Sequence, residues 1–294
     1  IKAIHYFSLA ADQNCSASLY NLGIIYLEGK HTQKDINKAI YYFTRASKLY
    51  NYDAILNLSY IYLFEIRNQD INKAIQYATI ASRSNCAKAQ LLLGFIYLSE
   101  KFQRQDIKKA IEYFKLSAKN RNIDAYHPLG FLYHEGKYIS KNINLAISNY
   151  KEASSFNNRF SKNNLGVIYK RGDGVEKNIS NAIIFFEEAL RVKNDPISSY
   201  NLAHIYFYGE DVNADFEKSM VLLLKSFDNY FFIPNIILLS LIIVKKANLI
   251  SLEQIRNEIN HYNCNKAEEL CLVVFRFIQI YRLEDSVYYD DLYF

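Results

Sequence analysis

A short motif returns along this 294-residue chain at a nearly constant interval. A small residue, usually preceded by Lys, recurs at steps of 35 to 37 residues, at Ala3, Ala39, Ala74, Ala110, Ala146, Ala182 and Ser219. A second motif keeps the same step. It is a Leu followed by Gly, Ser or Ala, with a Tyr four residues beyond the Leu, at Leu22, Leu58, Leu93, Leu129, Leu165 and Leu202. A fixed period of this length marks an array of equal structural units, each of which contacts its neighbours.

Each repeat is predicted to consist of two helices, A and B. In helix A a small residue, the Leu and the Tyr stand four apart, so they lie on one helical face. The small residue after the Leu allows a neighbouring helix to approach closely. Helix A is expected to end in a left-handed residue at Gly29, Gly136, Gly172 and Gly209. Glu65 and Glu100 replace that Gly in two repeats, so those two loops are expected to differ.

Helix B is predicted to open with an N-cap, whose side chain accepts a hydrogen bond from the first turn, at Asp35, Asp70, Asp106, Asn142, Asn178 and Asp215. Each link to the next repeat holds an Asn, which is expected to adopt the left-handed conformation after helix B: Asn14, Asn51, Asn85, Asn122, Asn157 and Asn194. Pro128 is expected to interrupt helix A of the fourth repeat.

Residues 1–228 resemble Sel1-like repeats, a family related to the tetratricopeptide repeats. The segments that carry the resemblance are YNLGIIY at 20–26, DINKA at 35–39, YF at 42–43 and GDGV at 172–175. The resemblance implies an all-α superhelical solenoid of about seven helix pairs, whose A helices line a concave groove. It also implies adaptor work, in which the solenoid assembles protein complexes. The chain departs from the family where Asn replaces Gly in the links and where the seventh repeat lacks the Leu-Gly-Tyr motif.

The array is predicted to span residues 1–228, followed by degenerate repeats or capping helices over 229–283. Solenoids need such caps to close the core of their last unit. The remaining segment, 284–294, is acidic and aromatic. The longest apolar stretch, 231–244, has 14 residues, fewer than the roughly 17–25 that cross a membrane, so it is interpreted as a buried helix.

The sequence lacks the residue patterns of enzymes and metalloproteins. It contains no nucleophile-elbow, kinase or P-loop motif, and its Gly172-Asp173-Gly174 segment follows no predicted strand. His127 and His134 are seven apart, but no acidic residue completes a metal-binding pattern. We therefore predict no catalytic residue, no cofactor and no metal.

Charge and cysteine usage limit the partners and the compartment. Lys and Arg total 35 against 30 Asp and Glu, and they form no dense stripe of the kind that neutralises phosphates, so no nucleic-acid partner is expected. The four cysteines form no CxxC pair. Cys264 and Cys271 would be too far apart on one helix for a disulfide. This usage favours a reducing compartment, and the cytoplasm is the predicted location.

The predicted function is that of a non-enzymatic scaffold that binds a peptide or a partner domain in the concave groove. An Asn precedes the repeated Leu in four A helices, at Asn21, Asn57, Asn164 and Asn201. Such an Asn ladder can hydrogen-bond the backbone or a carboxylate of a bound peptide. Further candidates for the groove are Tyr20, His127, Asn163, Lys170, Tyr200 and His204. The alternative interpretation is that the ladder forms hydrogen bonds inside the solenoid.

Two other functions remain open from the sequence. The first is an adaptor of ER-associated degradation in the ER lumen, with glycosylation triplets at Asn14, Asn57 and Asn178. The second is the substrate-recruiting C-terminal arm of a larger enzyme such as a protein kinase. The sequence begins within a repeat, with Lys2 and Ala3 of a helix B, and this motivates the second alternative.

Overall fold

The structure, a computed structural model, describes residues 2–65, 69–193, 195–226, 235–236, 238–240 and 242. All regular structure in these ranges is helical, so the predicted all-α solenoid class is confirmed. The predicted capping helices and the acidic tail lie outside the described residues, apart from the helical, buried residues between 235 and 242. No helix in the described ranges is long and apolar enough to cross a membrane.

The helices alternate along the chain as the repeat predicts. The B helices are α1 (Lys2–Asp12), α3 (Ile36–Ser47), α5 (Ile71–Arg83), α7 (Ile107–Lys119), α9 (Ile143–Ser155), α11 (Ile179–Val192) and α13 (Phe216–Ser226). The A helices are α2 (Ser16–Glu28), α4 (Tyr52–Tyr60), α6 (Ala87–Leu98), α8 (Tyr126–Glu135), α10 (Arg159–Arg171) and α12 (Pro196–Tyr208).

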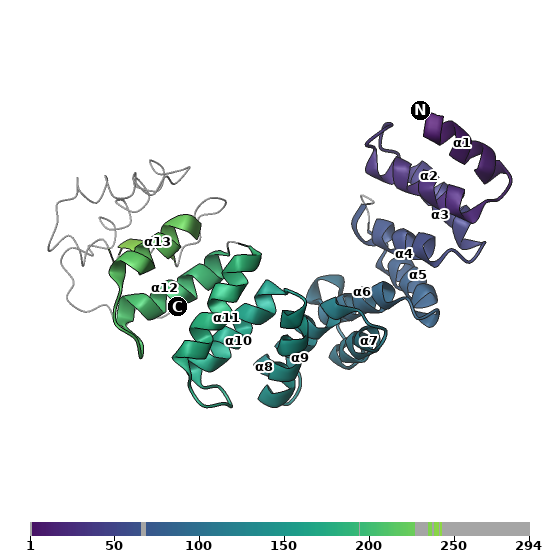
Figure 1. Ribbon diagram of the computed structural model, residues 1–294. Coiled ribbons are helices and arrows are strands. Elements are labelled where there is room, and N and C mark those ends of the chain that lie inside the picture. Colours follow the sequence, from purple (N-terminus) through teal and green to yellow (C-terminus); the bar gives the residue numbers. More distant parts are fainter. Residues whose placement is uncertain are drawn as a thin grey trace. The chain divides into compact units, whose positions relative to one another are not determined.

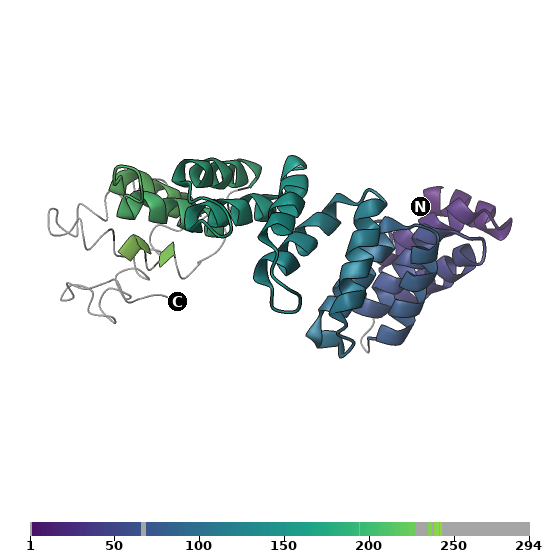
Figure 2. The same ribbon diagram turned by 90° about the horizontal axis from the view of Figure 1, so that it is seen from below.

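The chain divides into two compact bodies. Residues 1–142 form the N-terminal body, with α1 to α8, and residues 143–294 form the C-terminal body, with α9 to α13. Within each body every helix packs on the next one along the chain (Figure 1), and the view from below shows the same stacking (Figure 2). The A helices also contact each other, α2 with α4 and α10 with α12.

The contact between the two helices of a pair depends on the small residue after the repeated Leu. A Cβ added to Gly166 would lie 2.5 Å from the ring of Phe186, which is fully buried, and Gly23 and Gly94 stand in the same relation to rings of α3 and α7. In α4 and α12 the small residue is Ser59 or Ala203, and the residue at the place of the ring is smaller: Ala78 and Leu223. The two positions are therefore matched in size.

The loop from helix A to helix B is closed by an interlocking set of contacts. Between α6 and α7, the backbone N–H of Asp106 donates to the carbonyl of Tyr97 at 2.8 Å, and its carboxylate accepts from the N–H of Lys109 at 3.1 Å. The Tyr97 ring stacks on Tyr113 with centroids 5.8 Å apart. Lys109 Nζ lies 5.3 Å from the centre of the Tyr97 ring and 3.0 Å from the Asp106 carboxylate. One set of contacts thus explains the recurrence of Asp, Lys and Tyr.

These contacts recur along the array. The backbone N–H of the capping residue donates to the Tyr carbonyl at 2.8–3.0 Å in the six loops, from Asp35, Asp70, Asp106, Asn142, Asn178 and Asp215. The predicted side-chain cap is confirmed at Asp35, Asp70, Asp106, Asn178 and Asp215. Lys follows three residues later where the cap is Asp, whereas Asn142 and Asn178 are followed by Leu145 and Asn181. The Lys therefore accompanies the charge of the capping carboxylate.

A left-handed residue follows helix B, as expected, in the first five links, but this residue is not always Asn, and the predicted Asn194 lies outside the described residues. Asn14, Asn85 and Asn157 have φ of 56°, 59° and 63°, which confirms the prediction at these positions. The prediction is wrong at Asn51 and Asn122, because Tyr50 and Arg121, one residue earlier, take the left-handed conformation. Asn51 and Asn122 instead accept hydrogen bonds from the backbone of the following helical turn, at 2.9 and 3.2 Å.

The irregular positions behave largely as expected. Gly29, Gly136, Gly172 and Gly209 all have positive φ. Where Glu65 replaces this Gly, α4 continues as a π-helix (Ile61–Glu65), and where Glu100 replaces it, a 3-10 helix (Glu100–Phe102) follows α6. Helix A of the fourth repeat begins as a 3-10 turn (Ile123–Ala125), and Pro128 lies in the first turn of α8, where its missing N–H has no helical acceptor to lose.

Changing Gly166 to Ala tests the packing of the helix pair. In a helix without close neighbours this change stabilises by roughly 1 kcal/mol, because Ala is the better helix former. Here the added methyl group meets the Phe186 ring, so we expect Gly166→Ala to lower the free energy of unfolding by about 1–3 kcal/mol. The measurement is a urea denaturation curve.

The double variant Gly166→Ala/Phe186→Leu is the control, because it reproduces the natural pair Ala203 and Leu223. We expect it to be more stable than the sum of the two single changes by about 1 kcal/mol. Strict additivity of the single changes would contradict size matching across the pair.

The charged caps predict a pH dependence that the Asn caps lack. Hydrogen bonds from the backbone N–H of Lys109 and from its side chain hold the pKa of Asp106 below its ordinary value. Its stabilising effect is therefore present above the unfolded carboxyl pKa of about 3.9 and is lost as the pH falls through the lower folded pKa. Asp106→Asn keeps the acceptor and removes the charge, so its urea midpoint should fall less on acidification than that of the wild type.

The reverse substitution is the matched test of this pH dependence. Asn178→Asp combined with Asn181→Lys introduces the charged cap into α11 and should make the urea midpoint fall more steeply in acid. Equal pH profiles for the wild type and both variants would show that the charge on the cap contributes nothing to stability.

Candidate functional site

Each A helix has a second face, away from the repeated Leu and the small residue that follows it, which we call the A face. It comprises the residues one and two before the repeated Leu and those two and five after it, spaced so that they lie on one side of the helix. Neighbouring A helices adjoin within the N-terminal body: Leu22 of α2 and Leu58 of α4 share one core cluster, and Leu98 of α6 packs against the cluster that contains Leu129 of α8. Consecutive A helices of this body are therefore neighbours.

In the C-terminal body a hydrogen-bonded network joins the A faces of α10 and α12. Asn201 Nδ2 donates to Asn163 Oδ1 at 3.0 Å, and Ser198 Oγ lies 3.3 Å from the same oxygen. Ser198 Oγ also donates to Asp195 Oδ2 at 2.8 Å, and Asp195 caps α12 through the backbone N–H of Ser198. The amide nitrogen of Asn201 thus serves the contact between α10 and α12.

A charged cluster lies one turn further along the same two helices. His204 Nδ1 is 2.7 Å from Glu210 Oε1, and Lys170 Nζ is 3.3 Å from the same oxygen and 3.1 Å from Nδ1. Because an ammonium cannot donate to a protonated ring nitrogen, the arrangement is satisfied when Nδ1–H and Lys170 both donate to Glu210. The cluster ties α10 to α12 and to the loop after α12.

The pKa values of the cluster reflect burial and charge together. Burial lowers the pKa of Lys170, and the attraction of Glu210 offsets only part of this effect. Burial acts to raise the pKa of Glu210, but the hydrogen bond from His204 and the charge of Lys170 outweigh it, so this pKa lies below its ordinary value. Glu210 is therefore ionised at neutral pH and holds the two nitrogen donors in place.

The ladder asparagines do not share one role. Asn57 Nδ2 donates to the carbonyl of Asp53 in its own helix at 2.8 Å. Asn21 and Asn164 are half-buried, and neither side chain makes a hydrogen bond to the residues that the structure describes. Among the described residues, these two amides therefore use neither their donors nor their acceptor, whereas Asn57 and Asn201 each use a donor.

The other predicted groove residues are distributed over both bodies. Tyr200 lies edge-on to His204 at 5.8 Å between ring centres, beside Asn201. In the N-terminal body, Tyr20 packs its ring against Phe43 at 5.8 Å. His127 is half-buried, and burial lowers the pKa of its imidazole, so this side chain is neutral at neutral pH. The structure thus brings together the candidates of α10 and α12 and leaves those of α2 and α8 apart.

The sequence analysis missed the aromatic residues of the A face. Tyr60, Phe95 and Phe131 each stand two residues after the repeated Leu, and their side chains are 36%, 45% and 46% exposed. Their common position in the repeat was visible in the sequence. An apolar residue in a strongly apolar helix is ordinarily assigned to the core, and this explains the omission.

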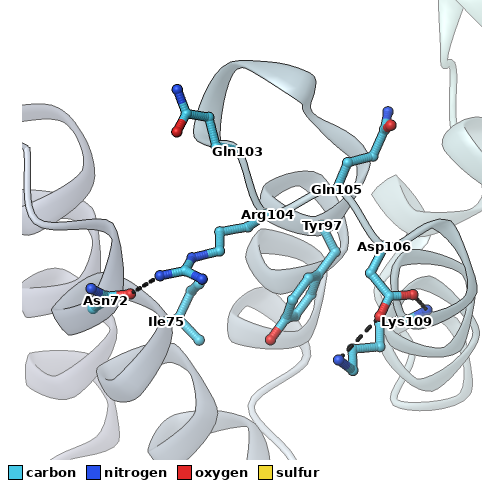
Figure 3. Close-up of a pocket in the computed structure, with 8 residues that line it drawn as sticks. All are labelled: Asn72, Ile75, Tyr97, Gln103, Arg104, Gln105, Asp106 and Lys109. Carbon is cyan, nitrogen blue, oxygen red and sulfur yellow. Dashed lines mark hydrogen bonds and ion pairs between the residues drawn. The ribbon is translucent and has the colours of Figure 1, made fainter.

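A polar hollow of about 480 Å³ lies on the loop side of the N-terminal body. Figure 3 shows Arg104 reaching toward Asn72 of α5, with the Nη2–Oδ1 distance 2.7 Å, and Lys109 beside Asp106. Lys109 and Asp106 are therefore already paired with each other, and Arg104 is hydrogen-bonded to Asn72. Nothing in this arrangement favours a particular ligand, and it belongs to the loops that close the helix pairs.

Within the described ranges, no group of three or more His, Cys, Asp or Glu side chains is placed to hold a metal ion. His127 and His134 both lie on α8. The arrangement of the described residues offers polar and apolar surface for a partner.

Two solved structures of bacterial proteins have a similar fold. A protective antigen of uropathogenic Escherichia coli strains, described as displaying an SLR fold, matches with a TM-score of 0.77 and 23% identity over 91% of this chain. The chain spans 57% of the length of that antigen. A Sel1 repeat protein from Oxalobacter formigenes matches with a TM-score of 0.62 and 24% identity, covering 70% of this chain and 84% of its own. At these identities the likeness shows the fold.

A search of curated proteins found no match. The family model described as Sel1 repeat matches seven segments, at residues 1–15, 16–51, 53–86, 87–122, 123–155, 160–191 and 196–229. Their boundaries follow the helix pairs, and together they cover most of the chain. The protein belongs to the Sel1 repeat family.

Proposed function

We propose that this protein is a non-enzymatic scaffold that binds a peptide or partner domain through the A faces of its helix pairs. Sel1 repeat proteins generally mediate protein–protein interactions. The observation that carries the proposal for this chain is that the amides of Asn21 and Asn164 lie on the A face, half-buried, without a hydrogen bond to the described residues. An amide held on a rigid helix in this way can pair with the backbone of an extended peptide.

The A face differs from the remaining repeat positions, and this difference supports the proposed function. The repeated Leu, the small residues and the capping residues are used by the fold, through burial or hydrogen bonds. The A face differs from repeat to repeat, with Ile24, Tyr60, Phe95, Phe131, Val167 and His204 at one equivalent position. The frame is therefore kept while the chemistry of the exposed face changes, as in a solenoid whose surface residues choose the ligand.

Removing the amide of Asn164 tests the proposal. A random peptide library displayed on phage is selected against the full chain, and the best peptides are synthesised. We expect Asn164→Ala to weaken their binding by about tenfold, which corresponds to one or two hydrogen bonds, without a change in melting temperature. Asn21→Ala is tested in the same way. Binding is measured by isothermal titration calorimetry.

Asn149→Ala in α9 is the matched control, because its amide already donates to the carbonyl of Leu145 at 2.7 Å on a B helix. This variant should bind the peptides as the wild type does. Selection of no peptide over repeated rounds, or wild-type affinity in both the Asn164 and Asn21 variants, would refute the proposed function.

For the compartment, we propose the cytoplasm over the ER lumen. Cys15 and Cys86 are both free thiols, and Cys15 is exposed. Of the three glycosylation triplets, Asn178 uses its side-chain oxygen to cap α11 and Asn57 lies inside α4. We expect the intact mass of the protein from its native source to be unchanged by a glycosidase. Loss of glycan mass at Asn14 or Asn178 would place the chain in the secretory pathway.

A further inference from the structure

An exposed aromatic row runs over the A helices of the N-terminal body. Tyr60 of α4, Phe95 of α6 and Phe131 of α8 occupy one repeat position, two residues after the Leu, and each is more than a third exposed. We call these three residues the aromatic row. A single exposed Phe is common on protein surfaces, whereas a row repeated on adjoining helices is typical of a surface that a partner covers.

The helices that carry the aromatic row adjoin one another. Leu63, in the π-helix after α4, shares a core cluster with Leu93 of α6, and Leu98 of α6 packs against the cluster that contains Leu132 of α8. The α4 end of the row extends along its helix, because the Tyr60 ring stacks on Phe64, which is 57% exposed, with centroids 6.3 Å apart. The row therefore lies on a single body and does not depend on the placement of the two bodies.

The charges that share this face are mainly acidic. Residues seven before and four after the aromatic row lie on the same side of the helix as the row itself. At these places stand Asp53, Glu135 and one base, Lys88, all exposed, and the exposed Asp124 stands in the 3-10 turn just before α8. The next A helix, α2, adds Glu28 at the equivalent place.

The B helices of the same body have the opposite charge. Along α7 the bases Lys108, Lys109, Lys115 and Lys119 stand against one Glu. Residues 1–142 contain more Lys and Arg than Asp and Glu, so the acidic character of the A face runs against the net charge of its body. Aromatic side chains bordered by carboxylates attract a ligand that combines apolar anchors with positive charge.

We propose that the A face of the N-terminal body binds a basic amphipathic peptide segment of a partner protein. Its apolar side chains pack on the aromatic row, and its Lys or Arg side chains pair with Asp53, Asp124 and Glu135. This inference rests on the proposed function and names the class of ligand for one of the two bodies. The A face of the C-terminal body differs, since Asn163, Lys170, Asn201 and His204 take the place of the apolar surface.

The test uses two labelled synthetic peptides of about 15 residues, long enough to place apolar side chains against successive helices. One contains Leu and Lys in amphipathic helical order, and the other has Glu in place of every Lys. Their binding to the full chain is followed by fluorescence anisotropy at two salt concentrations. We expect the Lys peptide to bind at least about tenfold more tightly at low salt, with a smaller difference at high salt.

Two variants connect this binding to the A face. Phe131→Ser removes one member of the row, and we expect it to weaken binding of the Lys peptide by about fivefold or more. Asp124→Asn/Glu135→Gln leaves every apolar contact in place and should weaken binding mainly at low salt. The second variant changes exposed side chains only, so it tests the proposal even where Phe131→Ser proves unstable.

Leu116→Ser in α7 is the matched control, because Leu116 is 36% exposed on a B helix of the same body. It should leave binding of the Lys peptide unchanged. The inference is overturned if the Glu peptide binds as tightly as the Lys peptide, or if Leu116→Ser weakens binding as much as Phe131→Ser.

The oligomeric state provides a further outcome. A dimer in analytical ultracentrifugation that Phe131→Ser dissociates would show that a second copy of this chain covers the row, and would also overturn the inference. The phage selection separates this inference from the proposed function. Selected peptides that require Asn164 but carry no basic or apolar preference would sustain the function and refute the inference.

Discussion

The close approach of helix A to helix B is the contact on which the rest of the structure depends. Gly23, Gly94 and Gly166 allow a Phe ring to lie against the backbone of helix A, at a distance where even one methyl group would collide with it. At this separation the Tyr of helix A reaches an aromatic ring of helix B, and the N–H of the cap reaches the Tyr carbonyl. The same close approach recurs in the pairs α2–α3, α6–α7 and α10–α11.

The loops satisfy their backbone groups without using side chains of the A face. Their polar backbone groups are satisfied by the caps at the start of helix B and by the left-handed residues at its end, for example Asp106 and Asn85. A buried backbone group left without a partner is costly, so these bonds are required of every repeat. Side chains such as Tyr60 and His204 form none of these backbone hydrogen bonds, and this permits the A face to differ from one repeat to the next.

The features that the sequence predicts well are those with a local physical cause. The period, the glycines at the end of helix A and the capping Asp residues depend on backbone geometry within a few residues, and the structure confirms them. The left-handed residue after helix B was misplaced at Asn51 and Asn122, because Asn is favoured both in that conformation and as an N-cap. In the structure Tyr50 and Arg121, one residue earlier, take the left-handed conformation, so Asn51 and Asn122 act as N-caps. Composition alone does not show which of the two neighbouring residues is left-handed.

The roles of the ladder asparagines were beyond sequence analysis for a different reason. Asn57 and Asn201 stand at the same repeat position, yet one bonds its own helix and the other bonds Asn163 on the neighbouring A helix. Which bond forms depends on whether the adjoining repeat offers an acceptor, and Asn201 and its acceptor Asn163 are 38 residues apart in the chain.

The two A faces of the chain suit different ligands. On α10 and α12, Lys170 and His204 are held by Glu210, so an acidic ligand would have to compete with a carboxylate that is already in contact. On α4, α6 and α8 the aromatic row is open, and the carboxylates beside it repel an acidic ligand. Specificity requires unfavourable contacts with the wrong partner as well as favourable ones with the right one. The acidic border therefore makes the aromatic row selective, because an uncharged apolar surface of the same area would accept any apolar segment.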